Sequence, residues 1–126
     1  MTTHFIAKHI QGKGRGKFLG YPTINLAIPS DFELDDGIYA VWVTIETTRF
    51  RGAMHWGPIP TFDSPEHSLE IFVLGAEDGV LDHADLSFVS VEIVKKLRDV
   101  IKFPSVDTLT IQMEKDVRLV RKLLQE

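Results

Sequence analysis

Residues 37–56 read GIYAVWVTIETTRFRGAMHW, and this stretch decides the fold class. Its first part, residues 37–48, is rich in the aromatic and β-branched side chains that are typical of strands. The second part, residues 49–56, follows at once and is expected to pair with the first as a hairpin. Prolines at positions 58, 60 and 65 are then expected to break the ladder, because proline has no N–H to donate.

A further strand is predicted at residues 67–74, where side chains of different character alternate. Leu69, Ile71 and Val73 share one face, and Glu70 lies on the other. If the apolar face is the core, Glu70 is an ordinary surface carboxylate; if the strand lines an open mouth, Glu70 can act as a general base. Further strands are predicted at residues 4–10 and 86–96, with an acidic loop at residues 75–85.

The C-terminal residues have the periodicity of a helix. From Ser105 onward, apolar residues recur at intervals of 4, 4, 3 and 4, at Leu109, Met113, Val117, Val120 and Leu124. This pattern predicts an amphipathic helix with one apolar stripe and with Ser105 as its N-cap. The stripe is expected to be core and is assigned no chemistry. Strands followed by a helix predict a closed antiparallel barrel with a helix packed on it.

The composition predicts a single domain, residues 1–126, with 44% hydrophobic and 25% charged residues. Without cysteine, disulfides and thiolate metal sites are excluded. No apolar run approaches the ~20 residues of a membrane span, and the N-terminus does not resemble a signal peptide. We therefore expect a cytoplasmic protein with no membrane partner. The net charge of −4 argues against a general nucleic-acid binder.

Residues 12–25, GKGRGKFLGYPTIN, hold the most informative candidate site. Glycine lets the backbone approach a ligand closely, and Lys and Arg side chains suit phosphate oxygens. The Thr23 hydroxyl and the Asn25 carbonyl are hard oxygen donors of the kind that Mg²⁺ accepts. The strip therefore indicates a nucleotide-phosphate site. The alternative is a solvated turn in which Thr23 and Asn25 only cap the backbone.

Two familiar phosphate motifs do not describe this strip. Gly12 and Gly16 enclose three residues rather than four, and Phe18 follows Lys17 where a Walker A loop needs Ser or Thr. No βαβ unit surrounds the glycines, which excludes a dinucleotide fingerprint. Elsewhere, the five histidines show no zinc-binding spacing, and residues 95–98, KKLR, are interpreted as solvated charge at a strand end.

Taken together and in order, these motifs resemble the riboflavin kinase (flavokinase) family over nearly the whole chain. The match includes the G-x-P-T-x-N core at residues 20–25, and its further blocks lie at residues 14–17, 37–41, 52–57, 60–62, 69–70, 97–98 and 102–103. Positions 55, 59 and 72 depart from the residues that are common in the family, and the family's acidic second-flap segment is not recognisable in residues 75–88. A flavin- or nucleotide-binding module without turnover therefore stays open as an alternative.

The resemblance implies a six-stranded, closed antiparallel barrel of Greek-key type with a C-terminal helix. It implies an ATP:riboflavin 5′-phosphotransferase that makes FMN, with Mg²⁺, riboflavin and ATP as its only partners, acting as a monomer. No H-x-G-H motif is present, so we expect no FAD synthesis.

The resemblance also implies roles for single residues. Glu70 is the catalytic base, and Thr23 and Asn25 bind the metal and the phosphates. Nucleotide binding is further implied for Gly14, Arg15, Gly16, Lys17 and Pro22, and flavin binding for Arg98 and Phe103.

Overall fold

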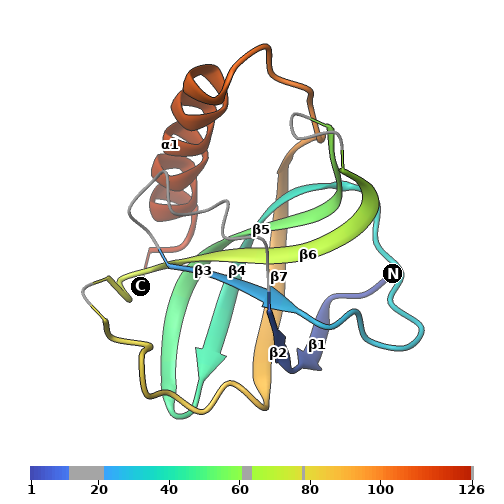
Figure 1. The fold of residues 1–126 in the computed structure, drawn as a ribbon. Coiled ribbons are helices and arrows are strands. Elements are labelled where there is room, and N and C mark those ends of the chain that lie inside the picture. Colours follow the sequence, from blue (N-terminus) through green and yellow to red (C-terminus); the bar gives the residue numbers. More distant parts are fainter. Residues whose placement is uncertain (12–21, 61–63, 78, 126) are drawn as a thin grey trace.

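The computed structural model describes residues 1–11, 22–60, 64–77 and 79–125. Within them the chain forms one antiparallel sheet and one helix (Figure 1). The elements are β1 (His4–Ala7), β2 (His9–Ile10), β3 (Thr23–Leu26), β4 (Gly37–Ile45), β5 (Thr48–Ile59), β6 (Ser64–Leu74), β7 (Val89–Arg98) and α1 (Val106–Leu123). The strand order is β1-β7-β4-β5-β6-β3-β2. The described chain offers no helical segment with the length and apolarity that a bilayer crossing requires.

The N-terminal segment lies at both edges of this sheet. One strand was predicted for residues 4–10, but β1 pairs with β7 whereas β2 pairs with β3. The switch occurs at Lys8, whose carbonyl accepts a hydrogen bond from the N–H of Ala27 at 2.9 Å. The prediction of a closed, six-stranded barrel is therefore not matched. The described strands form a curled, seven-stranded sheet, and its two edge strands, β1 and β2, follow each other in the chain but do not pair (Figure 1).

The predicted hairpin is confirmed. β4 and β5 pair without interruption from Gly37 opposite Trp56 to Ile45 opposite Thr48. The prediction that the prolines break the ladder is wrong in part, because β5 continues through Pro58 and β6 includes Pro65. Pairing survives there because the register shifts between Gly57 and Ile59, and proline is tolerated at such an irregularity.

The main core fills the inside of the curled sheet. The predicted alternation of β6 is confirmed, since Leu69, Ile71 and Val73 are buried and Glu70 is only half-buried. Met54 and the β4 valines complete this core with other strand residues. β7 starts later than predicted, at Val89, where its ladder with β1 begins. Phe88 precedes the strand and is 77% exposed.

Helix α1 covers part of the outer face of the sheet (Figure 1). Val117, Val120 and Leu124 pack there against two small residues, Ala40 and Ala53, which let the helix approach closely. At the end of the helix, Arg51 donates from Nε to the carbonyl of Leu124. The C-terminal half of the predicted apolar stripe is therefore core, as expected.

Replacing Ser105 with alanine should destabilise the protein by about 1 kcal/mol. The Ser105 hydroxyl accepts from the backbone N–H of Thr108 at 3.2 Å, and the Thr108 hydroxyl accepts from the N–H of Ser105 at 3.3 Å. This capping box confirms the predicted N-cap. Urea unfolding of S105A beside S105D measures the effect, because aspartate can still cap the helix. Equal losses in both variants would contradict the capping role.

Candidate functional site

A row of paired residues crosses the sheet and brings several predicted site residues together. Asn25 of β3 is opposite Glu70 of β6, and Glu70 is opposite His55 of β5. His55 in turn is opposite Ile38 of β4, which is opposite Arg98 of β7. Residues directly opposite each other in an antiparallel ladder point to the same face. All five therefore belong to the outer face of the sheet, the face on which α1 packs.

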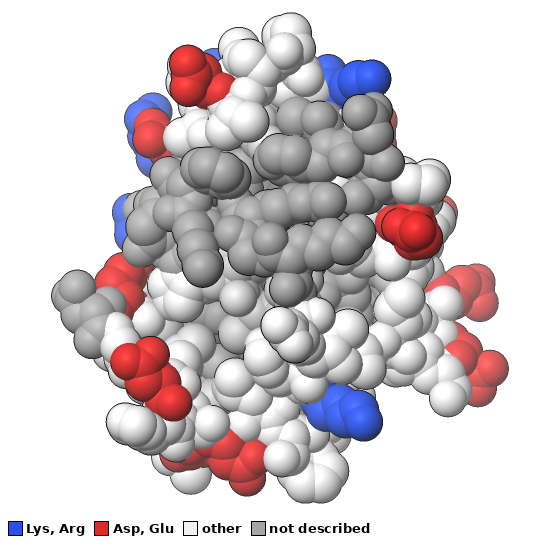
Figure 2. Space-filling model, in the orientation of Figure 1, with Lys and Arg blue, Asp and Glu red and all other residues white. Residues whose placement is uncertain are grey.

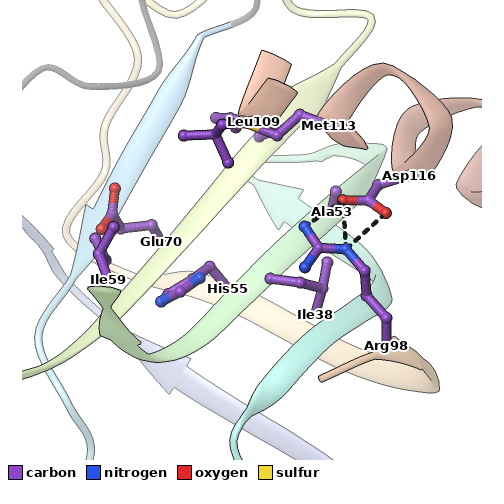
Figure 3. Close-up of a pocket in the computed structure, with 10 residues that line it drawn as sticks. Ile38, Ala53, His55, Ile59, Glu70, Arg98, Leu109, Met113 and Asp116 are labelled. Carbon is purple, nitrogen blue, oxygen red and sulfur yellow. Dashed lines mark hydrogen bonds and ion pairs between the residues drawn. The ribbon is translucent and has the colours of Figure 1, made fainter. Parts of the chain in front are cut away.

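A pocket that is partly open to solvent lies between this face and the N-terminal half of α1 (Figure 3). Its polar groups come from His55, Glu70, Arg98 and Asp116. Its apolar wall consists of Ile38, Ala53, Ile59, Phe72, Leu109 and Met113. Leu109 and Met113 belong to the stripe that was assigned no chemistry, so only the later turns of that stripe serve purely as core.

Glu70 lies on the pocket wall, half-buried. The hydroxyl of Ser68 donates to its Oε2 at 2.6 Å, while Oε1 accepts no hydrogen bond from a described residue. The sequence left two alternatives for Glu70, a surface carboxylate or a general base at an open mouth, and neither describes the structure fully. Glu70 does point away from the apolar core, yet α1 turns that outer face into a pocket. A carboxylate oxygen is thereby left available to a ligand.

His55 is the cross-strand neighbour of Glu70 and lies beside it in the pocket (Figure 3). Its Nε2 is 3.0 Å from the carbonyl oxygen of Gly57. Burial lowers the pKa of His55 below its ordinary value, although the Gly57 carbonyl and the Glu70 carboxylate oppose this shift. The side chain is therefore neutral near pH 7.

Gly57 has the backbone conformation that this contact requires. Its φ is +135°, and a Cβ there would lie 3.2 Å from the Asp36 side chain and 3.3 Å from that of Val100. Such a φ is open to glycine and strained for other residues. The carbonyl that holds His55 is thus fixed by a position that only glycine fills well.

Arg98 forms a buried ion pair with Asp116 of α1. Its Nε and Nη2 donate to the two carboxylate oxygens at 2.8 to 3.1 Å, and Nη1 donates to the carbonyl of Asp99. The side chains of Arg98 and Asp116 are only 15% and 7% exposed. The interpretation of residues 95–98 as solvated charge is therefore wrong for Arg98. Phe103 lies behind it, with its ring centroid 5.6 Å from the guanidinium carbon.

Asp116 is a pocket residue that the sequence reasoning missed. A signal was present, because position 116 follows Met113 by three residues and precedes Val120 by four, so it falls on the apolar stripe. An acid on such a face needs a partner when it is buried. Gln112, one turn earlier, also donates to its Oδ1 at 3.1 Å.

The predicted phosphate-side residues are described only in part. Gly14, Arg15, Gly16 and Lys17 lie outside the described residues. The carbonyl of Pro22 accepts from the N–H of Val73 at 2.9 Å and so anchors the start of β3 on β6.

Thr23 and Asn25 fit a metal–phosphate site. Both lie on the outer face, opposite Phe72 and Glu70 respectively. The Oγ1 atom of Thr23 is buried and has no hydrogen-bond partner among the described residues. A buried hydroxyl is normally satisfied, so this orphaned oxygen suits a ligand or a hard cation.

One face of the molecule carries described charges of both signs (Figure 2). In the view of Figure 2, the described acidic and basic side chains are scattered among uncharged ones, in keeping with the net charge of −4.

The family model and the curated relatives of this chain point to one family. The model of the flavokinase family, described as riboflavin kinase, matches residues 2–124. The bifunctional riboflavin kinase/FMN adenylyltransferase of Haemophilus influenzae is 32% identical over 89% of this chain and 35% of its own length. The RNA-binding riboflavin kinase RibR of Bacillus subtilis is 34% identical over 90% of this chain and 47% of its own length. The chain thus spans between a third and a half of these curated relatives.

Solved structures share the fold. A macrolide-efflux protein from Streptococcus pneumoniae superposes with a TM-score of 0.76 at 30% identity, covering 94% of this chain and 38% of its own. The riboflavin kinase of Trypanosoma brucei superposes with a TM-score of 0.61 at 19% identity, covering 99% and 82% respectively. The match of the family model over residues 2–124 shows that the chain belongs to the flavokinase family, the riboflavin kinases.

Proposed function

We propose that this chain transfers the γ-phosphoryl group of ATP to the terminal ribityl hydroxyl of riboflavin, giving FMN and ADP. The observation that carries the proposal is the pairing of Glu70 with Asn25 across β6 and β3. Glu70 lines the pocket and Asn25 is its cross-strand neighbour, which supports a base beside oxygen donors for a metal and phosphates. Family membership supports the same reaction.

The phosphate side of the proposed site begins at β3. We assign Thr23 and Asn25 to Mg²⁺ and the ATP phosphates, and residues 14–17 and Pro22 to nucleotide binding. When bound, Mg²⁺ neutralises charge on the phosphates during transfer. The chain contributes by holding two oxygen donors on one face of a short strand, beside Glu70.

The acceptor side is the pocket under α1. Its apolar walls suit a flat, aromatic ring system, and its polar groups lie toward Glu70 at one end and Arg98 at the other (Figure 3). We assign Arg98 to the flavin. Phe103 supports the arginine from behind and completes the flavin side.

Glu70 is the proposed general base. Its carboxylate removes the proton of the terminal hydroxyl as that oxygen bonds to the γ-phosphorus and the bond to the bridging oxygen of ADP breaks. The Ser68 hydroxyl holds Oε2 in place and leaves Oε1 for this proton. We also propose that the enzyme acts as a monomer, and that it acts in the cytoplasm, where ATP is available.

A direct assay tests the proposed function. Purified protein is incubated with riboflavin and MgATP, and FMN is separated by chromatography. We expect FMN to form in step with ADP. Folded protein that binds riboflavin and produces no FMN above the blank would overturn the kinase assignment in favour of a binding module.

Replacing Thr23 with valine should separate the metal role from a structural one. Valine keeps the shape and removes the orphaned hydroxyl, so the unfolding free energy should stay equal or rise by about 1 kcal/mol. Affinity for MgATP should nevertheless fall, by about 10-fold, because a ligand oxygen is lost. Urea unfolding and calorimetric titration measure the two quantities. A loss of stability with unchanged affinity would assign Thr23 to the fold alone.

A further inference from the structure

Backbone carbonyls hold the side chain of His55: Nε2 lies 3.0 Å from the carbonyl oxygen of Gly57, and the carbonyl of Pro58 adds a weaker interaction. A carbonyl oxygen accepts hydrogen bonds and cannot donate, so the contact of Nε2 with the Gly57 carbonyl places the ring proton on Nε2. Burial disfavours the charged form and lowers the pKa of the imidazole. In this neutral tautomer Nδ1 carries a lone pair. No described residue donates a hydrogen bond to it.

His55 also lies beside the proposed base, Glu70, on the wall of the pocket. It is directly opposite Glu70 on the neighbouring strand, and such side chains have Cβ atoms about 4.5–5.5 Å apart. Both residues line the same pocket, and the pocket's remaining charged groups, Arg98 and Asp116, are bound to each other (Figure 3). A chain of hydroxyl groups that reaches Glu70 with its last oxygen therefore runs beside His55.

We propose that His55 binds the acceptor substrate, with Nδ1 accepting a hydrogen bond from a hydroxyl next to the one that is phosphorylated. This inference rests on the proposed function for the identity of the acceptor. The neutral imidazole, held by the Gly57 carbonyl, contacts the hydroxyl chain of the acceptor and not its flavin ring. This contact favours acceptors that carry a polyol chain.

Two substitutions separate the two nitrogens of the ring. In H55Q the side-chain amide reaches the Nε2 position and can still donate to Gly57, but the acceptor at Nδ1 is lost. In H55N the amide oxygen stands near the Nδ1 position, and the contact with Gly57 is lost. We expect H55Q to weaken riboflavin binding by about 3- to 10-fold and H55N to weaken it less than 2-fold. H83Q, the same change at an exposed loop position, is the matched control.

Binding is followed by quenching of flavin fluorescence, with riboflavin and with lumiflavin, which has the same ring and no hydroxyl chain. Both variants should bind lumiflavin as the original protein does. The proposal is overturned if H55Q binds riboflavin normally, if H55N loses as much affinity as H55Q, or if lumiflavin weakens in parallel with riboflavin.

The same measurement distinguishes this proposal from the kinase assignment, because it needs no turnover. Riboflavin binding that depends on Nδ1 in a protein that makes no FMN would leave the role of His55 standing and remove the kinase activity. If FMN forms and H55Q and H83Q bind riboflavin equally well, the kinase assignment stands and the role of His55 is removed.

Discussion

Replacing Glu70 with glutamine is expected to lower kcat by about 10²- to 10⁴-fold, the usual contribution of a general base. Glutamine has nearly the same shape and can still accept the hydrogen bond from Ser68, so the pocket should keep its form. Affinity for MgATP should change little. Steady-state kinetics with riboflavin, together with nucleotide titration, measure both effects.

A matched control for this change lies on the same strand. Glu66 is exposed and lies four residues before Glu70, so E66Q removes one negative charge from the same face of β6 outside the pocket. We expect its kcat to stay at the original value. An unchanged kcat in E70Q would remove Glu70 from the role of base, and an equal loss in E66Q would point to a general effect of charge.

Replacing Asp116 with alanine is expected to destabilise the protein by about 3–5 kcal/mol, because it leaves the charge of Arg98 buried without its partner. Both side chains are well buried, so solvent screens this pair little. The pair also joins α1 to β7 at the pocket wall, and riboflavin binding should weaken in the same variant. Urea unfolding measures the loss of stability, and fluorescence quenching measures the loss of affinity.

Two further variants test whether the loss of stability in D116A comes from the buried ion pair. E114A removes an acid from an exposed pair on the same helix, 4.0 Å from Arg118, and should change stability by less than about 1 kcal/mol. The double variant R98M/D116L replaces both charges with apolar groups and should recover most of the stability lost in D116A, though not the flavin affinity. A loss in D116A no larger than that in E114A would contradict the buried-pair account.

Local pattern was sufficient for much of the fold. The hairpin at residues 37–56 was predicted because its first part is rich in aromatic and β-branched side chains, and the pairing of β4 with β5 confirms it. The helix and its N-cap were predicted because apolar spacing and a Ser residue at position 105 are local signals. The prolines predicted a break in the ladder that did not occur at Pro58, because a register shift beside Gly57 lets β5 continue.

Long-range pairing decided what local pattern could not. The split of residues 4–10 into β1 and β2 depends on two different partners, β7 and β3, far away in the sequence. Asp116 was not singled out from the sequence, because its partner Arg98 lies on another element, β7. Histidines scattered along the chain showed no motif, and His55 became a candidate ligand only through its register with Glu70.

The sequence by itself determined the fold class, the family resemblance, and the residue types offered at Thr23, Asn25 and Glu70, because these depend on periodicity and on short motifs. Only the tertiary structure decided that Glu70 faces a pocket, since a strand pattern gives the face of a side chain and not what covers that face. The helix that covers it is 36 or more residues away along the chain, and packing on Ala40 and Ala53 brings it there. The same packing brings Asp116 of the helix to Arg98 of β7.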